Sequence, residues 1–439
     1  MKKIILWSVI VIFTLVIAAA GFFWWSRPQV IQVDKNTKLT LLAVEYGRRH
    51  KAPVVKPKAA PQNNRRQFYG GGPAAFTTTN DTLVVWVLDE HPANQWPNFQ
   101  ALAYDKAETA CVGNWGNSNM RQISPTETII GIQLNAFPRH DRSFYLRFAS
   151  WGNGGQRVSK DQFVISNPAR GKTFPQWTPE PLPDTQSDGD LNVTLTKLVY
   201  GVQGFNGGVG SATDPMHKAV LAAFHMEQNG STVTNWEPVR IETSDATGND
   251  VQNNSWSNGR DDNGDATMTY QWGLWPDEPW KLHVEMSQTS GFSDDEIWTV
   301  TNVPVNPGDQ QDMWGYGNRR IPVIAETTLG GIPLKLYSAI QFTNQNWGGD
   351  GEKPGGFRVQ LGQGQNGGGQ DPGLNGLQMT LVSATDEQGR TVQAWNNYSW
   401  GGGDRQVQFQ NLRNATSLNI TIALHRDRFF DFTVKPAKQ

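Results

Sequence analysis

Three stretches of this chain repeat one pattern of turn and strand residues, and this repeat limits the possible folds more than any other feature. Two copies share the spacing Asp-x-x-Gly-x-x-Val and begin at Asp245 and Asp386. A looser copy begins at Asp105 and has Glu108 at the glycine position. An aspartate can accept hydrogen bonds from backbone N–H groups of a turn, and glycine supplies the positive φ that closes it. The repeat therefore predicts the same aspartate-capped turn between two strands three times.

Strands with one buried face surround each predicted turn. Apolar residues alternate with polar ones, as in Phe144-x-Leu146-x-Phe148, and this period of two is typical of half-buried strands. Two apolar strands open each copy, at residues 39–46 and 83–88, 191–200 and 220–226, and 334–340 and 357–361. An aromatic strand with a proline closes each copy, at residues 163–168, 298–304 and 432–436. Six or seven strands in about 120 residues is the size of a Greek-key sandwich.

The sequence thus predicts an all-β chain of three tandem Ig/FN3-like β-sandwich units after one N-terminal transmembrane helix. A length of 439 residues agrees with several domains. Two larger jelly rolls are the alternative. The predicted ranges are a short cytoplasmic tail at 1–3, an anchor at 4–25, units at 33–168, 189–305 and 321–437, a proline-rich linker at 169–188 and a second linker at 306–320.

The N-terminal segment predicts a membrane anchor. Residues 4–25 carry no charge, and 22 residues of helix rise about 33 Å, enough to cross a bilayer core of roughly 30 Å. Trp24 and Trp25 end the run, as aromatic residues do at a membrane interface. A cleaved signal peptide is the alternative, because Ala18 to Ala20 offer small residues for cleavage. We expect a single-pass protein with most of its chain outside the cytoplasm.

A basic insertion is predicted at residues 48–80. It is rich in proline, alanine, asparagine and glycine and has seven cations without an acidic residue up to Asn80. Such a composition predicts disorder. Its closeness to the anchor suggests binding to anionic lipid, at about 1 kcal/mol for each nearby cation; a solvated flexible loop is the alternative. The cations are Arg48, Arg49, Lys51, Lys56, Lys58, Arg65 and Arg66.

Composition narrows the classes of partner. The chain has 38 Lys+Arg and 40 Asp+Glu, so a near-zero net charge argues against nucleic acid as the main partner. Its single cysteine, Cys111, cannot form an intramolecular disulfide. We therefore expect the fold to depend on its apolar cores.

No catalytic or metal-binding signature stands out, and no cofactor is expected. The seven histidines are scattered, and neither a nucleophile elbow nor a phosphate-binding loop occurs. Two acidic groups could hold calcium: one with Asp261, Asn263 and Asp265, and one at residues 294–296. The first departs from a calcium loop at Ala266 and Trp272, where glycine and glutamate are needed. A solvated acidic turn is the alternative for both.

Tryptophan residues are the main candidates for ligand binding. Trp115, Trp256 and Trp400 precede turns at comparable positions, which favours packing at the ends of the sandwiches. The non-repeating tryptophans could instead form exposed platforms on which sugar rings stack. These candidates are Trp96, Trp151, Trp275 and Trp347.

The sequence favours a non-enzymatic function. Sandwich arrays bind partners through loops and edge strands, which leave no motif in the sequence. We therefore expect a membrane-anchored scaffold, structural or adhesive, that binds a protein or a polysaccharide of the cell envelope. The alternatives are an array of carbohydrate-binding modules that uses exposed tryptophans and a cell-envelope hydrolase.

Overall fold

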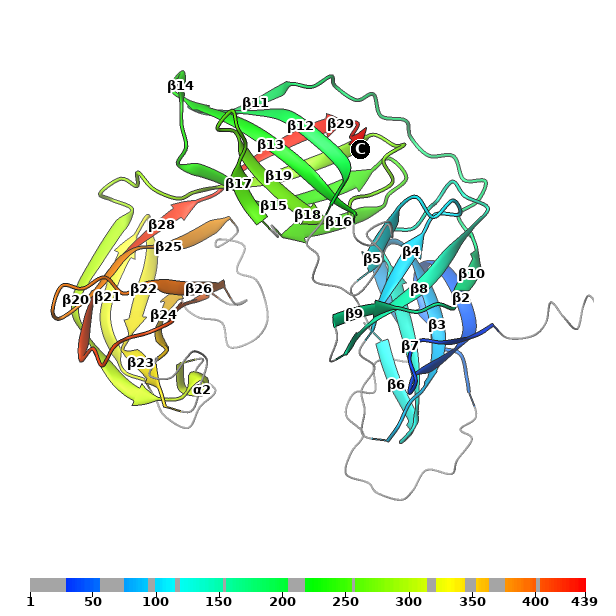
Figure 1. Cartoon of the computed structure of the whole chain (residues 1–439), viewed down its shortest axis with the longest axis horizontal. Coiled ribbons are helices and arrows are strands. Elements are labelled where there is room, and N and C mark those ends of the chain that lie inside the picture. The colour runs from blue at the N-terminus through cyan, green and yellow to red at the C-terminus, as the bar shows by residue number, and fades with distance from the viewer. Residues whose placement is uncertain are drawn as a thin grey trace, which may run out of the picture.

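The computed structural model describes residues 29–55, 75–93, 99–114, 119–152, 155–203, 218–254, 257–313, 321–343, 353–362, 376–399 and 403–439. Within these ranges nearly every regular element is a β-strand, and helix α2 (Gln310–Met313) has only four residues. The all-β prediction is confirmed. Figure 1 shows three bodies, with one lying between the other two. We call them the first, middle and third modules and define them by their strands.

The predicted anchor at residues 4–25 lies outside the described ranges. Among the described residues, the structure contains no helix with the length and apolar character that crossing a bilayer requires.

The first module (residues 30–166) packs two sheets face to face. One sheet has the order β1-β2-β3-β7-β6 and the other β10-β8-β4-β5, with β9 paired to β8. Their bounds are β1 (Val30–Gln32), β2 (Lys38–Lys51), β3 (Ala75–Glu90), β4 (Phe99–Tyr104), β5 (Cys111–Asn114), β6 (Asn119–Ser124), β7 (Glu127–Leu134), β8 (Ser143–Gly152), β9 (Gly155–Val158) and β10 (Phe163–Ser166).

The middle module (residues 184–288 and 428–438) also has two sheets. The first has the order β11-β12-β13-β18-β17, with β14 on β13 and β30 parallel to β12, and the second has the order β16-β15-β19-β29. Their bounds are β11 (Asp184–Asp188), β12 (Leu191–Gln203), β13 (Lys218–Gln228), β14 (Ser231–Thr232), β15 (Trp236–Asp245), β16 (Asp250–Asn254), β17 (Ser257–Arg260), β18 (Ala266–Gln271), β19 (Trp280–Gln288), β29 (Arg428–Val434) and β30 (Ala437–Lys438).

In the third module (residues 297–426), strand β20 belongs to both sheets and connects them. The path is β21-β22-β24-β23-β20-β28-β25, and β27 pairs with both β24 and β26. Strand β20 pairs with β28 through its first part and runs parallel to β23 through its last part. The bounds are β20 (Ile297–Gly308), β21 (Val323–Leu329), β22 (Ile332–Tyr337), β23 (Ala339–Phe342), β24 (Gly355–Leu361), β25 (Leu377–Asp386), β26 (Ala394–Ser399), β27 (Asp404–Phe409) and β28 (Ser417–Arg426).

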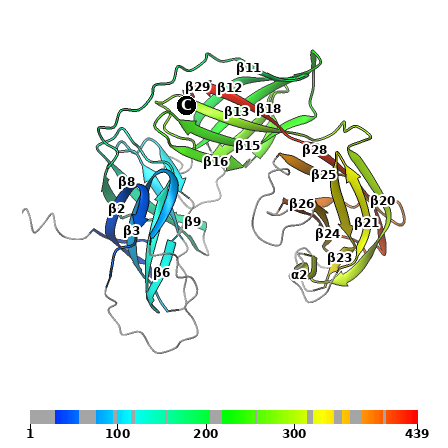
Figure 2. The same cartoon turned by 180° about the vertical axis from the view of Figure 1, so that it is seen from behind.

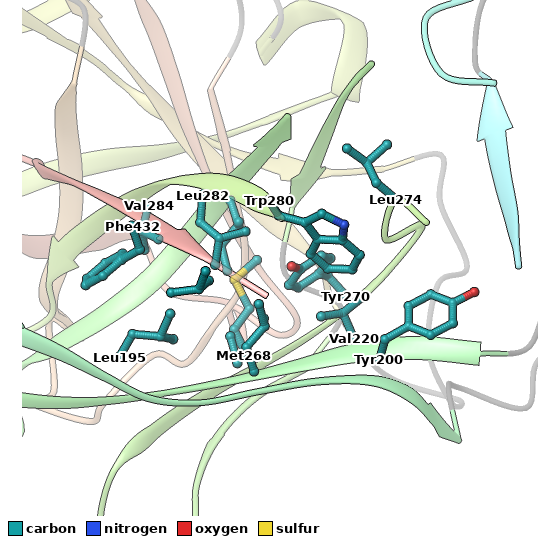
Figure 3. Close-up of a cluster of buried hydrophobic side chains, with 14 of the residues drawn as sticks. Leu195, Tyr200, Val220, Met268, Tyr270, Leu274, Trp280, Leu282, Val284 and Phe432 are labelled. Atoms are coloured by element: carbon teal, nitrogen blue, oxygen red, sulfur yellow. The ribbon is translucent and has the colours of Figure 1, made fainter. Parts of the chain in front are cut away.

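The strand alternation seen in the sequence produces the cores. Leu191, Val193 and Leu195 point inward from β12 and are fully buried. Leu282 and Val284 of β19 belong to the same cluster, and Figure 3 shows several of these side chains meeting between the sheets. Other clusters fill the first and third modules. The cluster of the middle module also includes first-module residues, among them Leu102, Tyr104 and Val112, so apolar packing continues across the junction of these two modules.

The predicted aspartate turns are confirmed in all three copies. The Asp245 carboxylate accepts backbone N–H groups of Thr247 at 2.8 Å and Asn249 at 3.2 Å. Asp386 likewise accepts the N–H groups two and four residues on, whereas Asp105 accepts those four and five residues on, from Thr109 and Ala110.

The residue three positions after each aspartate has a positive φ. The value is +92° at Gly248 and +76° at Gly389. Glu108 adopts 56° in the first copy although it is not glycine. The first copy therefore keeps the positive φ without glycine, but its turn closes one residue later, with the Asp105 N–H donating to the Ala110 carbonyl.

Two closing strands lie in modules other than those the sequence predicted. Residues 298–304 were expected to close the unit at 189–305, but β20 pairs with β28 of the third module. The strand around Phe432 was expected to close the unit at 321–437, but β29 pairs with β19 of the middle module. Figures 1 and 2 show β29 among the strands of the middle module. Alternation fixes which face of a strand is buried, but it does not select the neighbouring strand.

The predicted basic insertion is shorter than expected at both ends. Strand β2 continues to Lys51 and β3 begins at Ala75, so parts of the range 48–80 are ordered strand. His50 is buried there, and its ring lies 5.0 Å from that of Phe76. Residues 56–74, with four of the seven cations, lie outside the described ranges.

Candidate functional site

A cleft of about 400 Å³ lies where the first and middle modules meet. Four loops form it, two from each module, and no strand interior takes part. The lining residues are Asp105, Lys106, Ala107, Pro138, Arg139, His140 and Asp141 of the first module and Asp245, Thr247, Asn249, Trp275, Asp277 and Glu278 of the middle module. This volume is in the range of small-ligand sites.

The first and second copies of the aspartate turn lie on opposite walls of this cleft. Asp105 caps the turn on the first module, and Asp245 caps the equivalent turn on the middle module. Asp245 is buried, and it also accepts the hydroxyl of Thr247 at 2.6 Å. Because their own turns use these carboxylates, both walls are stiff.

Arg139 joins the two modules at the base of the cleft. Its guanidinium donates to Asn249 Oδ1 at 2.9 Å, to the Gly248 carbonyl at 2.9 Å and to the Tyr46 hydroxyl at 2.9 Å. The backbone N–H of Phe137 donates to the same Asn249 oxygen at 3.1 Å. Burial lowers the pKa of the Arg139 guanidinium, and nearby Tyr46 and acidic groups act in the opposite direction.

Ion pairs and hydrogen bonds engage the charged groups at the rim of the cleft. His140 Nε2 lies 3.2 Å from Glu278 Oε1, across the junction. Asp277 pairs with Lys438, which follows the last long strand of the chain, at 2.6 Å. Asp141 accepts the backbone N–H of Lys106 at 3.2 Å. The lining carries five carboxylate side chains against two cations, Lys106 and Arg139, so the cleft is acidic although each carboxylate has a partner.

The loop that carries Trp275 is fixed by its neighbours. Trp272 has a positive φ of 69°. A Cβ atom on Gly273 would lie only 2.5 Å from Val220, so only glycine fits there. The carbonyl of Trp275 accepts Nε1–H of Trp280 at 3.0 Å. These constraints hold Trp275 against the cleft.

Trp275 differs from the exposed platform that the sequence predicted. Its exposed fraction is 9%, so it is one wall of the cleft rather than a surface ring. Trp96 and Trp347 lie outside the described residues, as does the side chain of Trp151. The structure thus places one of the four predicted tryptophans in the cleft.

Sequence reasoning missed the other residues of the cleft. Arg139 and Asp141 lie just before the predicted strand that begins at Phe144, and the repeated Asp-x-x-Gly turn marks the opposite wall. The turn motif was the available signal. That two turns from different modules would face each other depends on inter-module packing, which the sequence pattern does not encode.

The two predicted calcium groups serve as turn caps. Asp261 accepts backbone N–H groups of Asn263 at 2.9 Å and Asp265 at 3.1 Å, and Asp265 itself binds His225 at 3.0 Å. At residues 294–296, Glu296 accepts the N–H and hydroxyl of Ser293. Within the described part of the chain, no group of three or more potential ligands could hold a metal ion.

Comparison with known proteins found no match: no family model, no curated protein and no solved structure is similar to this chain.

Proposed function

We propose that this chain is a membrane-anchored, extracytoplasmic scaffold that binds a glycan of the cell envelope in the cleft between its first and middle modules. The uncharged N-terminal run supports the anchor. The cleft supports the binding function, because it consists of loops held on rigid sheets. The deciding observation is that five carboxylate side chains and Trp275 line the cleft, which favours a ligand rich in hydroxyl groups over an anionic one.

We also propose that the modules are immunoglobulin- or fibronectin-like sandwiches. In the first module, the orders β2-β3-β7-β6 and β10-β8-β4-β5 correspond to the two sheets of such a domain. The middle module repeats them as β12-β13-β18-β17 and β29-β19-β15-β16. An experimental structure with a different strand order would contradict this proposal.

Binding to soluble saccharides tests the cleft. The full chain in detergent should bind members of a panel of cello-oligosaccharides, chito-oligosaccharides and peptidoglycan fragments, with a saturable change in tryptophan emission because Trp275 lines the cleft. Asp141→Asn and Glu278→Gln should each weaken the affinity about tenfold, since each removes a charged hydrogen-bond acceptor.

The control is Asp262→Asn, because Asp262 is exposed and is not among the residues that line the cleft. Binding that the two cleft variants leave unchanged would place the site elsewhere. No saturable binding to any saccharide of the panel would contradict a glycan ligand and favour a protein partner.

A further inference from the structure

Each module has one strand that occupies an equivalent place in its sheet, here called the closing strand. In the first module, β10 closes its sheet by pairing antiparallel with β8, with Phe163 opposite Leu146. In the middle module, β29 pairs with β19 in the same way, with Phe432 opposite Leu282. In the third module, β20 takes this place beside β28. Each module therefore has one closing strand at the same position.

Only the first module takes its closing strand from the chain that directly follows. Strand β10 comes after β8 and β9 in sequence. In the rest of the chain, β20 comes directly after β19 but pairs with β28, and β29 comes directly after β28 but pairs with β19. We infer that β20 and β29 are equivalent closing strands that the middle and third modules have exchanged with each other.

The connection between β28 and β29 explains why the exchange is required. Asp427 alone separates β28, which ends at Arg426, from β29, which begins at Arg428. A hairpin needs a loop of about two residues, so β29 cannot turn back along β28 without unpairing strand residues. The chain instead continues into the next module. The Asp427 N–H donates to the Gly376 carbonyl at 2.7 Å, which fixes the crossing point.

The connection between β19 and β20 crosses between the modules beside the connection at Asp427. Residues 289–296 lead from β19 to β20. The Leu424 N–H, near the end of β28, donates to the Glu296 carbonyl at 2.9 Å, so residues 289–296 are bonded to the strand that leads into the Asp427 crossing. Between them lies a cavity of about 520 Å³ at the junction of the modules.

Strands β20 and β29 carry similar inward-facing side chains, so each is able to close either sandwich. Phe430, Phe432 and Val434 of β29 alternate inward and are buried in the middle core. Phe432 lies 6.2 Å from Phe224 of the opposite sheet, and Figure 3 shows it near Val284. Trp298 and Val300 of β20 alternate in the same way against the third core. Equivalent patterns explain why each strand fits the other module.

The exchange places the third module within the middle one along the chain. The third module is the continuous segment 297–426, whereas the middle module needs β29 from beyond it, so two crossings, at residues 289–296 and at Asp427, tether the modules. Completion of the middle module therefore requires chain that follows the third module, whereas the first module has its own closing strand.

Paired cysteine substitutions test the exchange in the full chain with Cys111 replaced by alanine. Lys281 lies opposite Thr433 on β19 and β29, and Thr299 lies opposite Thr421 on β20 and β28. The hydroxyl oxygens of the second pair are 3.1 Å apart. Under mild oxidation, Lys281→Cys with Thr433→Cys, and Thr299→Cys with Thr421→Cys, should each form a disulfide within the monomer.

The matched controls recombine the same four substitutions. Lys281→Cys with Thr299→Cys, and Thr421→Cys with Thr433→Cys, should remain reduced because these residues lie in different modules. Disulfides in the recombined pairs would show that each module keeps its own strand and would overturn the inference. Disulfides that join two chains, seen as a dimer on a non-reducing gel, would overturn it as well, since the exchange would then be between molecules.

Discussion

Buried carboxyl groups in this chain are of two kinds. Asp245 and Asp386 are buried, but hydrogen bonds of their own turns satisfy them. Asp427, at the crossing between the modules, is only 7% exposed. Burial, and the nearby carboxyl group of Glu285, raise the pKa of Asp427 to about 8. The first kind fixes local structure, whereas the second makes stability fall as the pH rises.

Charged groups from every neighbouring element face Asp427. The carboxyl of Glu285 on β19 is itself paired with Arg240 at 2.8 Å. Arg428 donates to Asp190 at 2.7 Å. Burial lowers the pKa of His425 to about 4, so this ring stays neutral above that pH. The other groups around the cavity or coupled to Asp427 are Asp188, Asp295, Glu296, Arg405 and Arg426.

Asp427→Asn should change the pH dependence of stability. A carboxyl group whose pKa is raised on folding contributes stability below its unfolded value, about 4, and this contribution is lost as the pH rises to about 8. The variant stays uncharged, so it should match the wild type near pH 4 and melt several degrees higher at pH 8, since one pKa unit corresponds to about 1.4 kcal/mol. Thermal melting at both pH values measures this.

Asp431→Asn is the control for this prediction, because Asp431 lies four residues after Asp427, on β29, and its pKa shifts in the opposite direction. Burial acts against the shift, but hydrogen bonds from His283 and Lys281 lower the pKa of Asp431. That variant should lose stability at high pH rather than gain it. Equal melting of Asp427→Asn and the wild type at pH 8 would contradict the raised pKa.

At the scale of elements, the sequence predicted where the strands lie in the chain better than which strands pair with each other. The alternation at residues 191–200 and 220–226 lies within β12 and β13, and the aspartate turns were predicted residue by residue. The partners of β20 and β29 were not predictable, because their inward residues have similar patterns. The one-residue link at Asp427 was the missed signal.

Removal of residues 428–439 should unfold the middle module. The deletion takes Phe430, Phe432 and Val434 out of its core. Burial of one such side chain contributes about 1.5–3 kcal/mol, so the loss is comparable with the total stability of a domain. Circular dichroism should show loss of strand signal, and limited proteolysis should leave the first module protected.

Deletion of residues 437–439 alone is the matched control, because it removes only the short strand β30. That protein should keep its fold. A middle module that stays protected in the longer deletion would show that β29 is not part of its core.

At the scale of the whole molecule, the sequence predicted separate sandwich units but not how they meet. The cleft depends on Arg139 of the first module and Asn249 of the middle module, which are 110 positions apart in sequence. Arginine and asparagine are common at exposed loops, so neither residue signals an interface. The cleft is therefore a property of module packing, and only the turns that form its walls were predictable.

Arg139→Met should loosen the first module from the middle one. Methionine keeps an apolar chain against Phe137 but removes the hydrogen bonds to Asn249, Gly248 and Tyr46, at a cost of about 1.5–3 kcal/mol for each bond to a charged group. Small-angle scattering should show a larger radius of gyration, and saccharide binding in the cleft should weaken.

Arg170→Met is the control, because Arg170 is an exposed arginine of the linker between these modules. Scattering that is the same for Arg139→Met and the wild type would show that other contacts fix the junction.

The order in which the modules become complete differs from their order along the chain. Strand β20 is made before the rest of the third module, whose last strand ends at Arg426, whereas the middle module waits for β29. A chain emerging from the ribosome or a translocation channel can thus finish the first body, then the third, and only then the middle one. Until β29 emerges, β19 presents an open edge to its surroundings. Translation that stops early would leave this edge uncovered permanently.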